Sequence, residues 1–491
     1  MAPRSEGVGA APPGPELEVA LVLPEPGARR TRRELYEQLR AAIRSGRLAP
    51  GLRMPATRDL AGRLGVSRNT VTAVYELLVS EGDLQARPGS GTFVAEALQP
   101  EARRAAAPDM AGRVRPLWTQ PSPLAPGPMA PRHFLLGAPD HAAFPWDLWR
   151  RLAGRALRAH ARQPAPGAPQ GAPALRQAIA GHLSFARGVA CRAEDVLVTS
   201  GAQQAFDLIA KVLVHRPGVR VAVEDPGYPP VRQAFAAAGA EVLSAPVDDE
   251  GLVVEAAPEG AEVICVTPSH QFPLGAPMSP ARRQALLALA RRTGAVVIED
   301  DYDGEFRFDG RPLEALQTLD LSGQVLYVGT FSKSLFPDLR LGFIVAPEWA
   351  RRPLVAARMA TGGPSQTAQA TLAAFIAEGR LARHVRRMRR IYAGRRRALL
   401  EALADAPPGW LEPFPSAAGL HLALRLPGDA DARGLLRLAA GLGVGAYPLS
   451  QFAADPGRQN GLALGYGRLA EADVRIGAAA LAAAARRMAG T

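Results

Sequence analysis

Two lysines stand in a chain whose basic residues are otherwise all arginine. Of the 58 basic residues 56 are Arg, and the two lysines are Lys211 and Lys333. An amine that forms a Schiff base must be partly neutral, and the end of a buried strand favours this because burial disfavours the ammonium form. Lys333 follows the apolar run VLYVGT, whereas Lys211 lies within a predicted helix. The sequence therefore predicts Lys333 as a Schiff-base lysine and Lys211 as a surface residue.

Phosphate-binding groups accompany Lys333. Thr330 and Ser332 carry hydroxyls that can donate hydrogen bonds, and Arg340 follows seven residues after the lysine. Earlier in the chain, VLVTSGAQQAFDL reads as a strand, a turn and a helix, so the amides of Gly201 and Ala202 open a helix. Free amides at a helix start bind anions. These groups together predict a phosphate cradle.

Other side chains at the ends of predicted strands suit an aromatic cofactor ring. Asp300 ends the apolar run AVVIED and can hold a pyridinium nitrogen protonated, which makes such a ring an electron sink. Tyr302 can donate to a phenolic oxygen on the ring, and Tyr228 can stack on its face. His270 and Gln271 follow a further strand, although a single histidine is more often structural than a ligand.

The same acidic segment permits a different interpretation as a calcium loop. Asp301, Asp303 and Glu305 alternate in DDYDGEF. The EF-hand form of such a loop needs glycine at its sixth position, and Gly304 falls at the fourth when Asp301 is the first. We therefore expect no metal here.

Strands and helices alternate from His133 onward. The runs VRVAVED, AEVICVTP, AVVIEDD, VLYVGT and LGFIVAP are each bounded by Gly, Pro or Asp, with Ala-, Leu- and Arg-rich helical patterns between them. This alternation predicts an α/β domain with a mostly parallel sheet. Open parallel sheets bind ligands at the carboxyl ends of their strands, where the chemical groups above lie.

Composition divides the 491 residues into four parts. Residues 1–28 are rich in Pro, Ala and Gly and predict a flexible N-terminus, and residues 95–131 hold eight prolines and predict a semi-stiff linker. Between them residues 29–94 form a compact basic module, and residues 132–491 form the α/β body with a smaller subdomain from about residue 380.

The sequence has no apolar run long enough to span a membrane, and Cys191 and Cys265 form no metal or redox motif.

The basic module has the pattern of a helix-turn-helix followed by a wing. Leu35, Leu39 and Ile43 recur on one face of a first helix; Thr57 can cap a second helix and Ser67 a third. LQARPGSGTFVA after the third helix predicts a hairpin with a glycine-rich tip. The module therefore predicts a small α+β winged helix-turn-helix, unless it is a helical protein-interaction domain.

Charge favours DNA as the partner of this module. Residues 29–94 hold 12 Arg against six acidic residues, and the whole chain carries a formal charge of +12. The start of the third helix offers Ser67, Arg68, Asn69 and Thr70 to base edges, because that end enters the major groove in such modules. Phosphates suit a further set of groups: Arg58, Thr72 and the amides of Gly89, Ser90, Gly91 and Thr92.

These motifs carry a resemblance to known families. LGVSRNTV and the wing GSGTFV resemble GntR-type regulators, and TSGAQQAFDL, EDPGYP, PSHQFPLG, IEDDYDGEF and TFSKSLFPDLRLG resemble fold-type I aminotransferases. Together they resemble MocR-type regulators over roughly residues 30–490. The resemblance implies pyridoxal 5′-phosphate on Lys333, with Asp300 and Tyr302 as catalytic partners. It also implies a homodimer.

Two positions depart from the aminotransferase pattern. Pro166 stands where a tyrosine from the partner subunit often reaches the phosphate in that fold. Ala463 stands in NGLALGYGRL where an arginine usually holds the substrate carboxylate, and Arg458 is the nearest preceding arginine. Without that clamp a substrate carboxylate is less well positioned, which argues against efficient transamination.

We therefore expect a cytoplasmic regulator that binds double-stranded operator DNA and responds to an amine, an amino acid or pyridoxal 5′-phosphate itself. Two alternatives remain open: an active aminotransferase with a DNA-binding appendage, and a repressor whose body has lost the cofactor and serves only for dimerisation.

Overall fold

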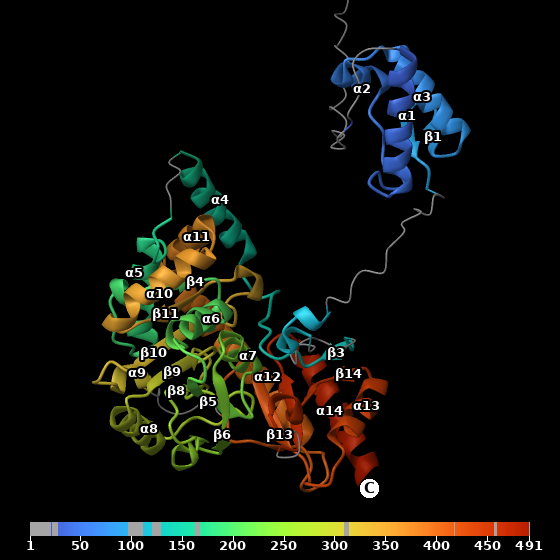
Figure 1. Ribbon diagram of the computed structural model, residues 1–491. Helices are drawn as coiled ribbons and strands as arrows, with labels where there is room; N and C mark the ends of the chain where they lie inside the picture. Colours follow the sequence, from blue (N-terminus) through green and yellow to red (C-terminus); the bar gives the residue numbers. More distant parts are fainter. Residues whose placement is uncertain are drawn as a thin grey trace, which may run out of the picture. The chain divides into compact units, whose positions relative to one another are not determined.

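The computed structural model describes residues 21, 28–96, 111–119, 129–162, 167–308, 314–416, 418–455 and 459–490. Almost all of the predicted N-terminal segment 1–28, most of the predicted linker, and the positions Pro166 and Arg458 lie outside the described residues. The chain divides into two compact units, Met1–Val114 and Arg115–Thr491 (Figure 1).

Three helices form the core of the first unit: α1 (Ala28–Arg44), α2 (Thr57–Leu64) and α3 (Arg68–Ser80). Leu35 and Leu39 of α1 are fully buried in one cluster with Leu60 of α2 and Val74 of α3. Gly65 takes a left-handed conformation with φ of 64° and ends α2, which allows the tight turn into α3. The predicted helix-turn-helix is therefore present.

The starts of α2 and α3 differ in how they are capped. The Ser67 hydroxyl accepts a hydrogen bond from the Thr70 amide at 3.1 Å, as the sequence predicts for a cap. The prediction for Thr57 is wrong, because Thr57 is the first residue of α2 and Ala56 occupies the cap position without a side-chain hydrogen bond.

The wing is a two-stranded antiparallel hairpin of β1 (Leu84–Arg87) and β2 (Gly91–Val94). Leu84 pairs with Val94 and Arg87 pairs with Gly91. Gly89 has φ of 74° and Gly91 φ of 113°, so the turn uses backbone conformations that glycine adopts without strain.

An eight-stranded sheet with the order β4-β11-β10-β9-β8-β5-β6-β7 lies at the centre of the second unit. Its strands are β4 (Val196–Thr199), β5 (Arg220–Asp225), β6 (Glu241–Asp248), β7 (Gly251–Leu252), β8 (Val263–Val266), β9 (Val296–Asp301), β10 (Val325–Thr330) and β11 (Gly342–Val345). The pairs from β10 through β9, β8 and β5 to β6 are parallel, and β11 is antiparallel to β10 and to β4. The predicted α/β class with a mostly parallel sheet is confirmed.

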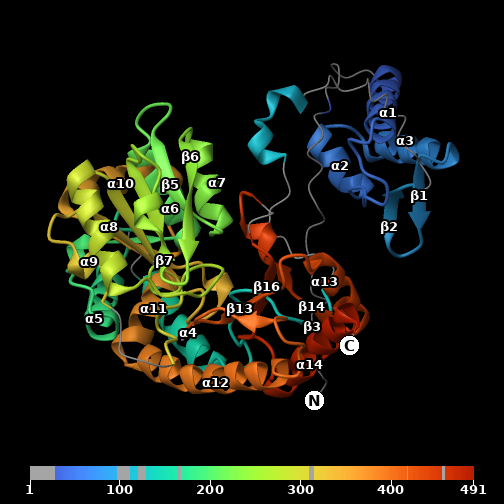
Figure 2. The same ribbon diagram turned by 90° about the horizontal axis from the view of Figure 1, so that it is seen from below.

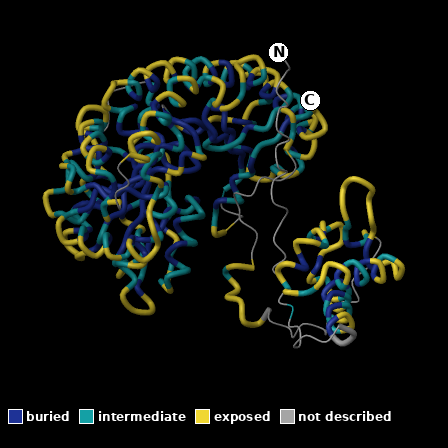
Figure 3. The backbone as a smooth tube through the Cα atoms, turned by 90° about the horizontal axis from the view of Figure 1, so that it is seen from above, coloured by how far each residue is buried: buried dark blue, intermediate teal, exposed yellow. Residues whose placement is uncertain are grey.

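Helices cover both faces of this sheet (Figure 1), and the interior of the unit is mostly buried backbone (Figure 3). These helices are α4 (Trp146–Arg162), α5 (Pro173–Arg187), α6 (Ala202–Leu213), α7 (Pro229–Ala238), α8 (Pro280–Thr293), the short α9 (Leu316–Leu319), α10 (Glu348–Thr361) and α11 (Gln366–Ala377). Successive residues of β4 alternate between two buried clusters: Val196 and Val198 share one with Leu175 of α5, and Leu197 shares the other with Phe206 of α6. A strand buried on both faces explains why these runs are continuously apolar.

A smaller subdomain follows the long helix α12 (Arg380–Leu403), which packs along α14 (Figure 2). Its antiparallel sheet has the order β12 (Glu412–Pro413), β13 (His421–Arg425), β16 (Gly461–Gly465) and β15 (Tyr447–Pro448), with helices α13 (Ala432–Gly441) and α14 (Glu471–Ala489). β3 (Arg132–His133) pairs in parallel with β14 (Val444–Gly445), so the start of the body joins this subdomain. None of the described helices combines the length and apolarity that a membrane crossing requires.

Candidate functional site

The predicted cofactor-binding residues lie at one edge of the large sheet, at or just after the carboxyl ends of its strands. Gly201 follows β4, Tyr228 follows β5, His270 follows β8, Asp300 and Tyr302 lie at the end of β9 and just beyond it, and Lys333 follows β10. Parallel strands end at a common edge, so five separate loops converge there.

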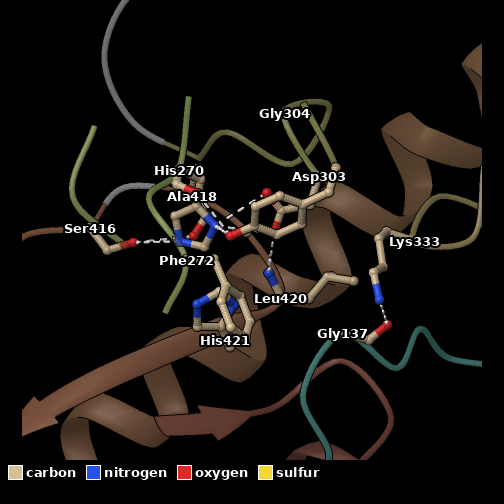
Figure 4. Close-up of polar contacts among 12 residues, drawn as sticks. Gly137, His270, Phe272, Asp303, Gly304, Lys333, Ser416, Ala418, Leu420 and His421 are labelled. Carbon is tan, nitrogen blue, oxygen red and sulfur yellow. Dashed lines mark hydrogen bonds and ion pairs between the residues drawn. The ribbon is translucent and has the colours of Figure 1, made fainter. Parts of the chain in front are cut away.

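Lys333 is half-buried against the loop before α4. Its Nζ donates to the Gly137 carbonyl at 3.1 Å (Figure 4). A Cβ added to Gly137, which has φ of +64°, would lie 2.3 Å from that Nζ, so the close approach requires glycine. Burial lowers the pKa of Lys333, against the opposing effect of Asp303 and Asp300. A lowered pKa makes the neutral amine more accessible, and the neutral amine is the form that attacks an aldehyde.

Asp300, whose charge acts on Lys333, has an unsatisfied carboxylate oxygen. The side chain is buried, and its Oδ1 has no hydrogen-bond partner. Burial, with Asp301 and Asp303 nearby, raises the pKa of Asp300 well above its ordinary value. An orphaned buried carboxylate oxygen is costly, and a cationic N–H donor would relieve that cost. The residue therefore fits the protonated ring nitrogen of a pyridine cofactor.

Tyr228 lies next to this carboxylate. Burial, followed by the charge of Asp300, raises the pKa of Tyr228 to about 12. Its ring packs edge-on against Phe272 at 5.4 Å between centroids and against Phe206 at 6.5 Å. Tyr228 also lines a small cavity with Asp300.

An anion cradle is formed by the start of α6 and the turn before β11. Gly201 is the cap of α6, and a Cβ added to it would lie 3.6 Å from Cζ of Arg340. The amides that open α6 at Ala202 and the Arg340 guanidinium are therefore neighbours, and both attract a phosphate. Thr330 donates to Ser332 Oγ at 3.1 Å, which holds these two hydroxyls together after β10.

The Tyr302 hydroxyl is held in place by His270. The Tyr302 hydroxyl donates to the His270 carbonyl at 2.8 Å and lies 2.9 Å from its Nδ1. Burial, followed by the charge of Asp303, raises the pKa of Tyr302 well above its ordinary value, so the hydroxyl keeps its proton and remains a donor. His270 therefore lies behind Tyr302 as its support.

The acidic residues that permitted a calcium-loop interpretation do not point to one centre. Asp301 Oδ2 accepts from Arg187 Nε at 2.7 Å, whereas both oxygens of Asp303 lie 3.1 Å from His270 Nδ1. His270, Asp303 and His421 offer ligand-type atoms within 4.8 Å of one another, and hydrogen bonds within the protein already use His270 Nδ1, Asp303 and His421 Nε2. This arrangement serves a hydrogen-bond network.

Glu224, a residue that the sequence analysis did not single out, lies beneath the site. One of its carboxylate oxygens accepts from the amide and hydroxyl of Thr267 and from Gln271, while the other has no partner. Burial raises the pKa of Glu224 to about 7. The run VAVED shows an apolar strand that ends in two acids, but which of them is buried depends on tertiary contacts.

Replacing Glu224 with Gln is expected to reduce the pH dependence of stability. A carboxyl whose folded pKa is raised to about 7 contributes stability at low pH that is lost as pH rises through 7. For wild type that loss between pH 5 and pH 8 is on the order of 2–3 kcal/mol from this group. Urea denaturation at both pH values measures the free energy of unfolding. Equal pH dependence of E224Q and wild type would contradict the assignment.

Ala463 occupies the strand position at which aminotransferases usually have an arginine that holds the substrate carboxylate. It pairs with Ala423 and Tyr447 in the small sheet and is fully buried in an apolar cluster that includes Phe272 and Phe452. Tyr302 packs against the same cluster. This wall beside the ring site is therefore apolar.

The predicted DNA-contacting residues lie on the surface of the first unit. Arg58, Arg68 and Asn69 are exposed, and so are Gly89, Ser90 and Gly91 at the wing tip. Ser67 and Thr70 hydroxyls lie 2.8 Å apart and hold each other in the cap. At the start of α3, Arg68 and Asn69 are therefore exposed to solvent and accessible to DNA.

A further basic residue stands beside the wing. A Cβ on Gly91 would lie 3.2 Å from Arg53 Nε, so the Arg53 guanidinium lies along the start of β2. Arg53 precedes the second helix in the sequence, and only its pairing with Phe93 brings it to the wing, so the sequence alone does not indicate its place there.

Two family models match the chain. Aminotransferase class I and II matches residues 155–484, and the gntR family of bacterial regulatory proteins matches residues 31–94.

Similar proteins match the chain over nearly its full length. The probable rhizopine catabolism regulatory protein MocR of Rhizobium meliloti is 41% identical over 461 residues, which cover 91% of this chain and 92% of that protein. The HTH-type pyridoxine biosynthesis transcriptional regulator PdxR of Corynebacterium glutamicum is 34% identical, covering 92% and 95%.

Solved structures resemble the second unit. Kynurenine aminotransferase of Pyrococcus horikoshii, solved with PMP, superposes with a TM-score of 0.70 at 28% identity, covering 77% of this chain and 98% of that one. LysN, the alpha-aminoadipate aminotransferase of Thermus thermophilus, was solved with N-(5′-phosphopyridoxyl)-L-leucine; it gives a TM-score of 0.66 at 30% identity, covering 73% and 92%.

Proposed function

Since the chain belongs to the MocR-type regulators, in which a GntR-family DNA-binding domain precedes an aminotransferase class I and II domain, we propose that it regulates transcription in response to a small amine or amino acid bound at its cofactor site. The chain is a DNA-binding transcription regulator, and its body binds pyridoxal 5′-phosphate. The observation that carries the effector proposal is the half-buried Lys333, which feels the charge of Asp300, together with the unpaired Asp300 oxygen.

In this proposal each residue of the cofactor site has one role. Lys333 binds the cofactor covalently, Asp300 pairs with the ring nitrogen, and Tyr302 donates to the ring oxygen. Tyr228 covers the ring face, and His270 supports Tyr302. The phosphate is held by Gly201, Ala202, Thr330, Ser332 and Arg340. When bound, the cofactor supplies a reversible covalent link to primary amines.

The apolar wall at Ala463 favours sensing over turnover. An efficient transaminase needs its substrate carboxylate fixed, because orientation supplies much of the rate. Ala463 and its neighbours Ala423 and Tyr447 offer no cation there. A ligand can therefore react with the cofactor and change the body without being held for repeated turnover.

Occupancy of the site is tested by absorbance. Purified protein titrated with pyridoxal 5′-phosphate should develop a band near about 400 nm, and an added primary amine should shift that band. A protein that stays colourless would support the alternative in which the body serves only for dimerisation. Steady consumption of an amino acid with a keto-acid acceptor would support the aminotransferase alternative.

The proposal includes a homodimer that presents two winged helices to one operator in the cytoplasm. Large apolar side chains are exposed on the body, among them Trp146 and Leu157 on α4 and Met359 on α10. A two-fold dimer would bury such surface and would bring two readers to two half-sites separated by whole helical turns when they share one DNA face.

Sedimentation velocity checks the dimer. At micromolar concentration the chain of 51.8 kDa is expected to sediment at twice that mass. Substituting Leu157 by Glu, which places a charge on an exposed apolar position of α4, should shift the distribution toward monomer if α4 lies in the interface. A wild-type monomer under these conditions would contradict the proposal.

A further inference from the structure

The small C-terminal subdomain contacts His270 and Asp303, which lie behind the cofactor site (Figure 4). Ser416 Oγ lies 3.2 Å from His270 Nε2, and the Leu420 amide donates to Asp303 Oδ2 at 3.2 Å. His421, the first residue of β13, lies with Nε2 3.0 Å from the Pro273 carbonyl. Three contacts from one short stretch thus join the subdomain to the loops after β8 and β9.

Two glycines make this approach possible. A Cβ on Gly419, which has φ of +85°, would lie 2.0 Å from His270 Cε1 and 2.7 Å from Asp303 Oδ2. A Cβ on Gly275, with φ of +87°, would lie 3.0 Å from Cβ of Ser416. A side chain at Gly419 is excluded by space and by backbone conformation, and one at Gly275 would be strained by its backbone conformation and would crowd Ser416.

The orientation of His270 is fixed from both sides of its ring. The ring is 1% exposed, with both Asp303 oxygens 3.1 Å from Nδ1 and Ser416 Oγ 3.2 Å from Nε2. A buried carboxylate next to Nδ1 keeps a proton on that nitrogen. The histidine whose ring is held in this way is also the residue whose carbonyl accepts from Tyr302.

Building on the proposed function, we propose that Asp303 and Ser416 are positioning residues that act through His270 on the Tyr302 hydroxyl, so that the C-terminal subdomain responds to the occupancy of the cofactor site. In the structure the Tyr302 hydroxyl donates to the His270 carbonyl and lies 2.9 Å from Nδ1 of the His270 ring. When Tyr302 donates to a bound ring oxygen instead, His270 loses that donor, and its contacts with Ser416 and, through Asp303, with Leu420 readjust. The contacts of the subdomain therefore depend on which acceptor the Tyr302 hydroxyl uses.

A double-mutant cycle tests this coupling. Affinity for pyridoxal 5′-phosphate is measured from the visible band in wild type, Ser416→Ala, Tyr302→Phe and the double variant. We expect Ser416→Ala to weaken binding about three- to tenfold and to shift the band when Tyr302 is present, but to have no effect in the Tyr302→Phe background. Ser184→Ala, at an exposed position of α5, serves as the matched control and should behave as wild type.

A second readout follows the subdomain itself. In wild type the Leu420 amide, which bonds to Asp303, should change its hydrogen-exchange rate on cofactor binding. The change should be smaller in Ser416→Ala and in Asp303→Asn. Equal weakening by Ser416→Ala in both tyrosine backgrounds, or exchange at Leu420 that ignores the cofactor, would overturn this inference and leave the proposed function standing. A wild type that never acquires the band would overturn both.

Discussion

Lys333→Ala is expected to abolish covalent trapping of the cofactor. Lys333 is one of two lysines in the chain, it is half-buried, and desolvation lowers its pKa. Borohydride reduces a lysine–cofactor Schiff base to a stable bond, and intact-mass analysis then detects the added cofactor. Wild type should gain one cofactor per chain, and Lys333→Ala should gain none, because the other lysine of the chain, Lys211, is exposed on α6.

Lys211→Ala is the matched control for this experiment. Lys211 lies on α6, is 47% exposed and pairs with Asp207 at 2.6 Å, as expected for the surface residue that the sequence predicts. This variant should retain full trapping. A cofactor still trapped in Lys333→Ala, at Lys211 in particular, would show that the lysine assignment is wrong.

Arg68→Ala should weaken operator binding about ten- to hundredfold, since an arginine that contacts a base edge contributes about 1–3 kcal/mol. Arg68 is the first residue of α3 and is exposed, and the neighbouring Ser67–Thr70 hydrogen bond keeps that end of the helix ordered. Electrophoretic mobility shift or fluorescence anisotropy on operator DNA at fixed salt measures the change. The visible spectrum should stay as in wild type, because the cofactor site is in the other unit.

Arg33→Ala removes the same charge from an exposed position of a different helix, α1. Arg33 lies on α1, is 80% exposed and pairs with Glu37. Its loss should weaken binding only through the general electrostatic attraction to DNA, and should do so equally for operator and unrelated DNA. An equal loss of operator affinity in the Arg33 and Arg68 variants would mean that Arg68 makes no base contact.

Residues at strand ends could be predicted because their chemistry depends on local order along the chain. An apolar run followed by Asp300 and Tyr302, or by Lys333, places each side chain at the same edge once the strands are parallel. The glycine–helix junction at Gly201 is local in the same sense. These predictions depend on the direction in which each strand runs, and they do not depend on which strands lie next to it in the sheet.

Contacts between distant segments could not be predicted in this way. Gly137 meets Lys333 across 196 residues, and Ser416 meets His270 across 146. An isolated glycine or serine has no periodicity that reveals its partner. The same limit explains Glu224, since the sequence does not show which acid of VAVED turns into the interior.

Capping shows a similar boundary between local and tertiary information. Ser67 caps α3 as predicted, whereas Thr57 enters α2 as its first residue. Both have a hydroxyl in front of a helical pattern, and helix ends shift by a residue or two with their surroundings. Elements could thus be predicted more securely than their first residues.

The central claim is that a ligand at Lys333 changes the affinity of the winged helix for DNA. It is tested most directly by measuring operator affinity of the cofactor-loaded protein with and without a panel of primary amines and amino acids, in wild type and in Lys333→Ala. We expect at least one amine to change the wild-type affinity about fivefold or more, the scale of a coupling of about 1 kcal/mol, while Lys333→Ala binds operator without any response. Operator affinity that no amine alters in wild type, or a response that persists in Lys333→Ala, would contradict the account.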